Sequence, residues 1–162
     1  MMCSNVYLSQ VLNRYKSFGG VFACDELKSL NLPTKKVLSI IVNTEPLDSN
    51  ISGHWVLITF FSKNKALIKC EIFDSLAQPI SNLPPALQDY IRLLKIPVRY
   101  LTVQIQSDLS DFCGLFCMAR FMSILINERL NIFTNNFSVR NLDQNDKISV
   151  KLILRYIREL DV

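Results

Sequence analysis

Two cysteines, a histidine and an aspartate are the residues of this sequence whose types and spacing could do chemistry. Cys113 and Cys117 lie in "DFCGLFC", and the one histidine of the chain, His54, lies in "GHW". Asp74 follows twenty residues after His54. A thiol beside an imidazole that a carboxylate orients is a nucleophile for acyl transfer. The pattern therefore raises the hypothesis of a cysteine hydrolase.

Other chemistries fit the two cysteines less well. A structural zinc ion takes four ligands in most proteins, whereas Cys113, Cys117 and His54 supply three. Two cysteines four residues apart on one helix are poorly placed for a disulfide, because their Cβ atoms lie beyond the preferred separation. We therefore expect no metal site and no bond between these two thiols.

The nucleophile hypothesis selects Cys113 over Cys117. The segment "CGLFCMARFMSILIN" predicts an almost wholly apolar, buried helix, with Ser110 and Asp111 as candidates for its N-cap. A thiol in the first turn lies beside unpaired backbone N–H groups and the positive end of the helix dipole, which favour the thiolate. We expect Cys113 to be an exposed nucleophile and Cys117 to be core packing one turn deeper.

Amide hydrolysis also requires hydrogen-bond donors for the oxyanion. The backbone N–H of Cys113 is one candidate. The side-chain amides of Gln104 and Gln106 are others, because both emerge on one face at the end of a predicted strand over residues 98–106. Gly114 removes a side chain where a substrate backbone has to approach.

A predicted hairpin brings His54 and Asp74 together. The segments "HWVLITFF" and "ALIKCEIFD" have the composition of strands and flank the polar turn "SKNK". With the turn centred near Asn64, the numbers of opposed residues sum to about 128, so His54 faces Asp74 with Cβ atoms roughly 4.5–5.5 Å apart. The first strand is apolar on both faces, which indicates a central strand of the sheet.

The other predicted elements complete an α+β chain. Apolar spacing predicts a helix over residues 5–18, which Gly19 and Gly20 end. No repeat or linker-like segment divides the sequence, so we expect one domain over residues 1–162. The remaining predicted elements are a strand over 36–43, the loop "NTEPLDSNISG", and helices over 84–95, 113–127 and 149–160.

Composition and charge limit the functional classes. Hydrophobic residues make up 49% of the chain and charged residues 20%, which is typical of a globular domain. The longest apolar runs fall far short of the roughly 20 residues that span a bilayer, so we expect no membrane partner. The N-terminal segment lacks the order of a signal peptide, and the five irregularly spaced cysteines are expected to be reduced thiols. The net charge of +4 allows weak attraction to nucleic acid without requiring it.

In combination, these motifs resemble the adenovirus protease (adenain) family. The resemblance rests on "GHW", on an acid about twenty residues later, and on "QSDLSDFCGLFC" with its Gln-x6-Cys-Gly-x-x-Cys spacing. The segments "FGGVFACDEL" and "FDSLAQP" look closer still to the proteases of Maverick/Polinton elements and adintovirus-like viruses. SUMO-specific proteases share the broader plan. The resemblance covers about residues 18 to 128, and the last thirty-odd residues match no pattern of these families.

The resemblance implies a papain-like, adenain-like α+β fold with the nucleophile at the N-terminus of a buried central helix against a mixed sheet. It implies His54 as the base, Asp74 as the orienting acid, Cys113 as the nucleophile and Gln106 as an oxyanion donor. The acid is Glu in adenain and Asp here, as it is in the SUMO proteases.

Three neighbours of these residues are expected to bind substrate. They are Gly53, Trp55 and Gly114, although Trp55 fits a core position at least as well.

The resemblance further implies a cysteine endopeptidase that processes viral or virus-like precursor proteins, such as capsid or core proteins, at small, glycine-containing sites. The alternatives are a peptidase of ubiquitin or SUMO-like modifiers and an inactive relative that binds DNA or a partner protein. No cofactor is expected to be required. Adenain is stimulated by DNA and, through a disulfide, by a viral peptide, but the stretch "LKIPVRYLTVQIQ" lacks the corresponding cysteine. We expect a monomer located in the virion and in the host nucleus or cytoplasm, and not secreted.

Overall fold

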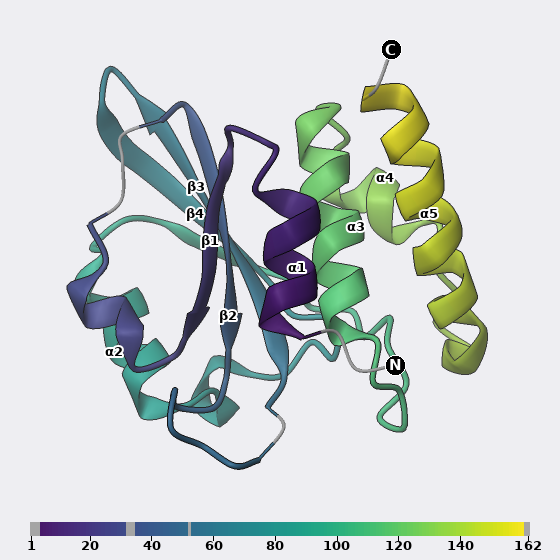
Figure 1. Ribbon diagram of the computed structural model, residues 1–162, viewed down its shortest axis with the longest axis horizontal. Helices are drawn as coiled ribbons and strands as arrows, with labels where there is room; N and C mark the ends of the chain where they lie inside the picture. Colours follow the sequence, from purple (N-terminus) through teal and green to yellow (C-terminus); the bar gives the residue numbers. More distant parts are fainter. Residues whose placement is uncertain (1–3, 32–34, 52, 161–162) are drawn as a thin grey trace.

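A mixed five-stranded sheet forms the centre of the computed structural model, which describes residues 4–31, 35–51 and 53–160 (Figure 1). In their order across the sheet, the strands are β1 (Phe18–Ala23), β2 (Val37–Asn43), β3 (Trp55–Lys63), β4 (Ala66–Phe73) and β5 (Val98–Tyr100). The pairs β1–β2 and β4–β5 are parallel, whereas β3 is antiparallel to both of its neighbours.

Helices cover both faces of this sheet (Figure 1). One face carries α1 (Asn5–Leu12), α3 (Cys113–Leu125), α4 (Leu130–Thr134) and α5 (Asn145–Leu160), and the other carries α2 (Pro85–Leu93). The buried α3 against a mixed sheet confirms the predicted fold class. Within the described part of the chain, the helices are too short or too polar to span a bilayer.

The central strand is β3, as its composition predicts. Its residues from Trp55 to Phe60 are all buried. Leu57 packs into the core between the sheet and α3, and Ile58 packs into a second core on the face that carries α2. Alternate side chains of one strand thus reach two cores, which explains why β3 is apolar at successive positions.

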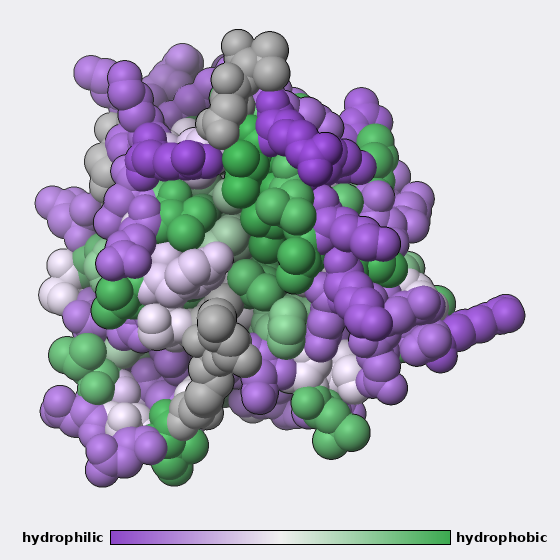
Figure 2. Space-filling view, turned by 45° about the vertical axis from the view of Figure 1, so that its right-hand side comes forward, coloured by the Kyte–Doolittle hydropathy of each residue, from purple (hydrophilic) through white to green (hydrophobic). Residues whose placement is uncertain are grey.

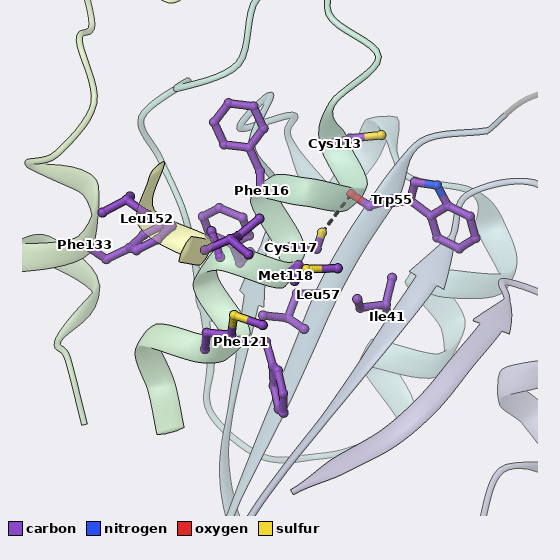
Figure 3. Packing of buried hydrophobic residues seen from close by; sticks show 14 of the residues in the cluster. Ile41, Trp55, Leu57, Cys113, Phe116, Cys117, Met118, Phe121, Phe133 and Leu152 are labelled. Carbon is purple, nitrogen blue, oxygen red and sulfur yellow. Dashed lines mark hydrogen bonds between the residues drawn. The ribbon is translucent and has the colours of Figure 1, made fainter. Parts of the chain in front are cut away.

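The helix α3 is the most deeply placed helix of the fold. Ten of its 13 residues are buried, among them Phe116 and Phe121, which belong to the same core as Leu57 (Figure 3). Its Arg120 is buried too, and the Nε and Nη2 atoms donate to Oε1 of Glu71 on β4 at 3.0 and 2.7 Å. This ion pair joins the central helix to the sheet inside a largely apolar interface.

The prediction for the N-terminal segment is partly wrong. The first helix ends at Leu12, and residues 18–23 form the edge strand β1 instead of a break. A Cβ atom on Gly19 would lie 2.9 Å from Cγ2 of Ile40, and Gly20 has a φ of 126°. The two glycines permit a close approach to β2 and a local irregularity of register, features that composition alone does not separate from a turn.

The strand predicted over residues 98–106 is also shorter in the structure. It ends at Tyr100, although the N–H of Leu101 still donates to the carbonyl of Ile72 at 3.1 Å. Beyond that point the chain leaves the sheet as a loop, in which the backbone N–H groups of Ile105 and Gln106 donate to the carbonyl of Ser75. Toward the C-terminus, α4 was not predicted, and α5 begins four residues before the predicted start.

Part of the helical face remains apolar at its surface. Figure 2 shows a band of hydrophobic side chains between hydrophilic margins on the face that is turned forward. The exposed large hydrophobic residues of the helices include Val6 and Tyr7 on α1 and Val150 and Leu154 on α5. The sheet therefore does not cover all of the apolar surface of the helical layer.

We expect Arg120→Met to lower the free energy of unfolding by about 3–5 kcal/mol, because the substitution leaves the buried Glu71 carboxylate without its cation. Urea unfolding followed by circular dichroism measures this loss. The matched control is Arg92→Met, which breaks an exposed pair with Asp89 and should cost less than about 1 kcal/mol.

The double variant Arg120→Met, Glu71→Met should recover most of the lost stability, since neither charge is then buried alone. A single Arg120→Met variant as stable as the wild type would contradict the anchoring role of this ion pair.

Candidate active site

The candidate residues gather at one end of the sheet. His54 precedes β3, Asp74 follows β4, Gln106 lies in the loop after β5, and Cys113 is the first residue of α3. Because β4 runs antiparallel to β3 and parallel to β5, the start of β3 and the ends of β4 and β5 lie at the same end of the sheet. Residues far apart in the sequence thus meet at a single place.

The imidazole of His54 is held by the Asp74 carboxylate. The ring atom Nε2 lies 2.6 Å from Oδ1 of Asp74. The backbone N–H groups of Leu76 and Gln78 donate to the same carboxylate at 2.8 and 3.2 Å. Thr44 fixes the backbone of His54, because its Oγ1 accepts the His54 N–H at 2.9 Å and its N–H donates to the His54 carbonyl at 2.8 Å.

The pairing of β3 with β4 differs from the predicted register by two residues. Leu57 pairs with Phe73, so the numbers of opposed residues sum to 130 along most of the hairpin. A shift of two residues keeps His54 and Asp74 on the same face of the sheet, whereas a shift of one would have placed them on opposite faces. The imidazole therefore reaches the carboxylate diagonally rather than directly across the strands.

A bulge accounts for one residue of this difference in register, and the centre of the turn, between Asn64 and Lys65, accounts for the other. The turn itself is a two-residue turn at Asn64 and Lys65, whose φ angles are 52° and 65°. Between the pairs formed by Phe61 and Ser62, β4 contains one extra residue, so the register changes partway along the hairpin. The turn and the site therefore have separate registers, a feature that turn composition does not reveal.

Cys113 meets the other side of the imidazole. Its side chain and that of His54 interact by hydrogen bond and charge, and Nδ1 is the ring nitrogen that the Asp74 contact leaves for this role. The thiol is only 8% exposed, so the prediction of an exposed nucleophile is wrong. The reason is that the start of α3 packs beside Trp55 at the start of β3 (Figure 3) and belongs to the main core.

The second cysteine of the motif has the expected position. Cys117 is fully buried, and its Sγ donates to the backbone carbonyl of Trp55 at 3.3 Å, as Figure 3 shows. Among the described residues, Cys24, Cys70, Cys113 and Cys117 are buried thiols rather than disulfides, and Cys3 lies outside the described residues.

The N-cap of α3 is Phe112, and not Ser110 or Asp111 as predicted. The hydroxyl of Ser110 accepts the N–H of Phe112 at 3.2 Å and donates to Asp146 on α5 at 2.7 Å. Ser110 is thus drawn toward α5, and its hydroxyl braces the segment before the helix rather than capping it.

The first N–H groups of α3 precede its hydrogen-bonded turns. The carbonyl of Phe112 accepts the N–H groups of Leu115 and Phe116 at 2.8 and 3.1 Å. The N–H groups of Cys113 and Gly114 come before this point and belong to the donor end of the helix. They lie where an oxyanion formed beside the Cys113 sulfur would need hydrogen-bond donors.

The surroundings of His54 determine its protonation. Burial lowers the pKa of His54, but hydrogen bonds to Asp74 and Cys113, together with their negative charges, outweigh burial and raise the pKa to about 9. The imidazole is therefore protonated at neutral pH. An imidazolium beside the thiol is a general acid: it can protonate the amine that leaves the carbonyl carbon attacked by the sulfur.

The side-chain amide of Gln106 is buried and oriented at both ends. Its Nε2 donates to the carbonyl of Ser110 at 2.6 Å, and its Oε1 accepts the hydroxyl of Ser75 at 2.5 Å. An amide nitrogen has two hydrogens, so one is left for a ligand. Gln104 donates from its Nε2 to the Gln106 carbonyl and to Asp108, so the structure favours Gln106 over Gln104 as the oxyanion donor.

Ser75 is a site residue that the sequence reasoning missed. It is fully buried and follows Asp74 directly. Its backbone carbonyl accepts the N–H groups of Ile105 and Gln106 at 2.9 and 3.0 Å, and its hydroxyl donates to the Gln106 side chain. One residue therefore joins the strand end that carries the acid to the loop that carries the amide. A serine after an aspartate is ordinary turn composition, which gave no signal of this role.

The start of α5 braces the same loop. Asn145 is fully buried, and its Nδ2 donates to the carbonyls of Ile105 and Ser138 at 2.8 and 2.7 Å. Its Oδ1 accepts the N–H of Ser138 at 2.9 Å. The C-terminal residues, which match no pattern of the resembled families, thus support the segment that contains Gln106.

The three residues predicted to bind substrate occupy different positions. A Cβ atom on Gly53 would overlap Oδ1 of Asn43 and lie 2.7 Å from Cγ of Glu45. Trp55 is 6% exposed and belongs to the main core, and it also lines a pocket of about 320 Å³. Gly114 is buried in the first turn of α3. Contact of these residues with substrate stays a prediction.

These groups form a continuous set with the parts that acyl transfer needs. A thiol contacts a protonated imidazole, which a carboxylate holds, and the neighbouring Ser75 orients an amide donor. In the described ranges, no three side chains of His, Cys, Asp or Glu lie close enough together to hold a metal ion.

A comparison with family models supports this chemistry. The model of the Ulp1 protease family, C-terminal catalytic domain, matches residues 16–131. The matched range contains all four candidate residues and ends before α5. The match agrees with the resemblance to adenain-like cysteine proteases, whereas closeness to the Maverick/Polinton proteases stays a prediction. None of the curated proteins compared with the chain matches it.

We expect hydrolysis of a peptide substrate to slow as the pH rises through about 9, because the imidazolium of His54 loses its proton there. Asp74→Asn removes a bond and a charge that raise the pKa of His54. It should move this alkaline limb to lower pH and reduce kcat/KM by about 100-fold. The dependence of kcat/KM on pH measures both effects, and Asp89→Asn on the surface of α2 is the control.

Stability should follow the same titration. The folded pKa of His54, about 9, lies above the unfolded value, so the stabilisation is complete below roughly 6.5 and is lost as the pH rises through about 9. Thermal unfolding over this range should show the loss in the wild type and less of it in Asp74→Asn. An alkaline limb that does not move in Asp74→Asn would contradict the assigned cause of the raised pKa.

We expect Ser75→Ala to lower kcat for peptide hydrolysis about tenfold with little change in KM, because the Gln106 amide loses the bond that orients it. The rate of Cys113 alkylation should stay unchanged, since the thiol and imidazole are untouched.

Ser39→Ala is the matched control for this substitution. It removes another fully buried hydroxyl, bonded to Thr59 within the sheet at 2.9 Å, and should lower stability without lowering kcat. Equal kcat in Ser75→Ala and the wild type would rule out the positioning role.

Proposed function

Since the chain belongs to the Ulp1 protease family and is therefore a cysteine peptidase, we propose that it is an adenain-like endopeptidase. Its proposed substrates are viral or virus-like precursor proteins, such as capsid or core proteins. The observation that carries the proposal is the contact of one imidazole with both the Asp74 carboxylate and the Cys113 thiol, next to the oriented amide of Gln106.

The proposed reaction has two steps. The Cys113 thiolate attacks the scissile carbonyl carbon, and the oxyanion accepts hydrogen bonds from Gln106 Nε2 and from the first N–H groups of α3. The His54 imidazolium gives its proton to the leaving amine as the C–N bond breaks, which leaves a thioester on Cys113. Neutral His54 then takes a proton from water, whose oxygen attacks the thioester, and the C–S bond breaks to release the carboxylic acid product and restore the Cys113 thiolate beside the imidazolium.

Steric restriction near the sulfur supports cleavage at small, glycine-containing sites. The thiol of Cys113 is 8% exposed and the neighbouring Trp55 is 6% exposed. A substrate that reaches a sulfur so deeply placed has little room for side chains next to the scissile bond. Glycine residues there would allow the substrate backbone to approach the start of α3 closely.

A second candidate is a peptidase of ubiquitin or SUMO-like modifiers. One feature favours it, namely that the orienting acid is the shorter Asp74, as in SUMO proteases, rather than the Glu of adenain. The chemistry at Cys113 would be the same, and only the substrate would differ.

We further propose that residues 1–162 act as one monomeric protease domain. The packing of α5 against α3 and the bonds from Asn145 to the loop before α3 support this view. We also propose that the enzyme needs no cofactor, that DNA stimulates it through its net charge of +4, and that it acts in the virion and in the host nucleus or cytoplasm.

A cleavage assay tests the proposal. Wild-type protein should cleave a precursor protein that contains glycine-rich junctions, and Cys113→Ala should reduce the rate by at least about 1000-fold, because the nucleophile is absent. Mass spectrometry of the new termini identifies the sites. Cys117→Ala is the matched control, since it removes the other cysteine of the motif, a fully buried residue whose Sγ bonds the carbonyl of Trp55.

The same preparation should be incubated with ubiquitin and SUMO carrying a C-terminal fluorogenic amide. Faster release from these modifiers than from the precursor would favour the second candidate. Equal precursor processing by Cys113→Ala and wild type would reject both.

A further inference from the structure

A pocket lies at the same end of the sheet as the catalytic residues. It has a volume of about 320 Å³ and is lined by the start of α1, by the ends of β1 and β2, by loop residues between Glu45 and Ile51, and by Trp55. Across the sheet, β3 separates these strand ends from those that carry Asp74 and the loop of Gln106. The pocket and the oxyanion donor thus lie on opposite sides of His54.

The loop that forms the pocket is tied to the catalytic histidine. Thr44 forms hydrogen bonds with both the backbone N–H and the backbone carbonyl of His54, and these bonds hold the two ends of the loop together. Leu47, in the middle of the loop, donates its N–H to Asp25 after β1 at 3.0 Å. An extended substrate with its scissile bond at Cys113 would therefore pass this loop within a few residues.

One carboxylate is held inside this pocket. Glu45 is the single charged residue among the described residues that line it. Its N–H donates to Oδ1 of Asn43 at 2.8 Å, and its Oε2 accepts the hydroxyl of Ser49 at 3.1 Å. Gly53 lies close to Glu45 and Asn43, since a Cβ atom on it would lie 2.7 Å from Cγ of Glu45. The carboxylate is thus partly buried and positioned.

The charge around the pocket is opposite in sign to that of the whole chain. The loop over residues 44–54 contains Glu45 and Asp48 and no Lys or Arg, whereas the chain has a net charge of +4. The uncharged part of the lining includes apolar side chains, such as Phe22 and Leu47, that can pack along an aliphatic stem. A lysine or arginine side chain combines such a stem with a cationic end.

We propose that this pocket is a substrate subsite that binds a lysine or arginine side chain of the protein substrate, with Glu45 as its counter-charge. The inference rests on the proposed function and deepens it, because it adds a basic residue near the scissile bond to the small residues at the bond itself. The ammonium or guanidinium group hydrogen-bonds the carboxylate, while Ser49 keeps that carboxylate in place.

Fluorogenic peptide libraries test this subsite. Each library fixes one position, on either side of a glycine, as lysine or as its uncharged isostere norleucine. At one position the wild type should cleave the lysine library with a kcat/KM about tenfold higher, the effect of one charge-assisted hydrogen bond. Glu45→Gln should remove this preference by lowering cleavage of the lysine library to about the rate of the norleucine library. Glu45→Lys should instead favour a third library that fixes the same position as glutamate.

Asp48→Asn is the matched control, because it removes the same charge from the same loop at an exposed position outside the pocket lining. It should keep the preference for lysine. Cleavage that depends on Cys113 but shows no lysine preference, or a preference that survives Glu45→Gln, would overturn the subsite and leave the proposed function intact. A wild type that cleaves no member of any library would overturn both.

Discussion

The hydrogen bond between His54 and Asp74 is the interaction on which the rest of the site depends. It joins the start of β3 to the end of β4, so it forms only if these two strands pair in the correct register. It also orients the ring so that Nδ1 remains for Cys113. Together with the Cys113 contact, it outweighs burial and raises the pKa of the imidazole. The central position of β3, with a core on each face, fixes the strand that carries this histidine.

Much of this arrangement could be predicted from the sequence. The hairpin, the buried helix and the choice of Cys113 over Cys117 follow from composition and from the chemistry of a helix N-terminus. Membership of the protease family agrees with the resemblance that the spacing of these residues suggested. Each of these features depends on a sequence pattern that lies within one segment of the chain.

The features that could not be predicted depend on contacts between distant segments. The bulge in β4 changes the register without changing the composition of the turn. Ser75 matters because its hydroxyl and carbonyl both meet the loop of Gln106, a contact across 31 positions. The burial of Cys113 comes from packing against β3, and Arg120 is buried in an apolar helix because Glu71 on β4 accepts its hydrogen bonds. No periodicity of a single segment encodes such pairings.

The bonds from Asn145 and Asp146 to the loop before α3 have a consequence for the order in which the chain is made. Translation produces the nucleophile, the base and the acid well before these two residues, so a nascent chain carries a reactive thiol without the brace on its oxyanion loop. The brace on the oxyanion loop is therefore added only after α5 has been synthesised and has docked, so the geometry of this loop depends on the segment of the site that is made latest.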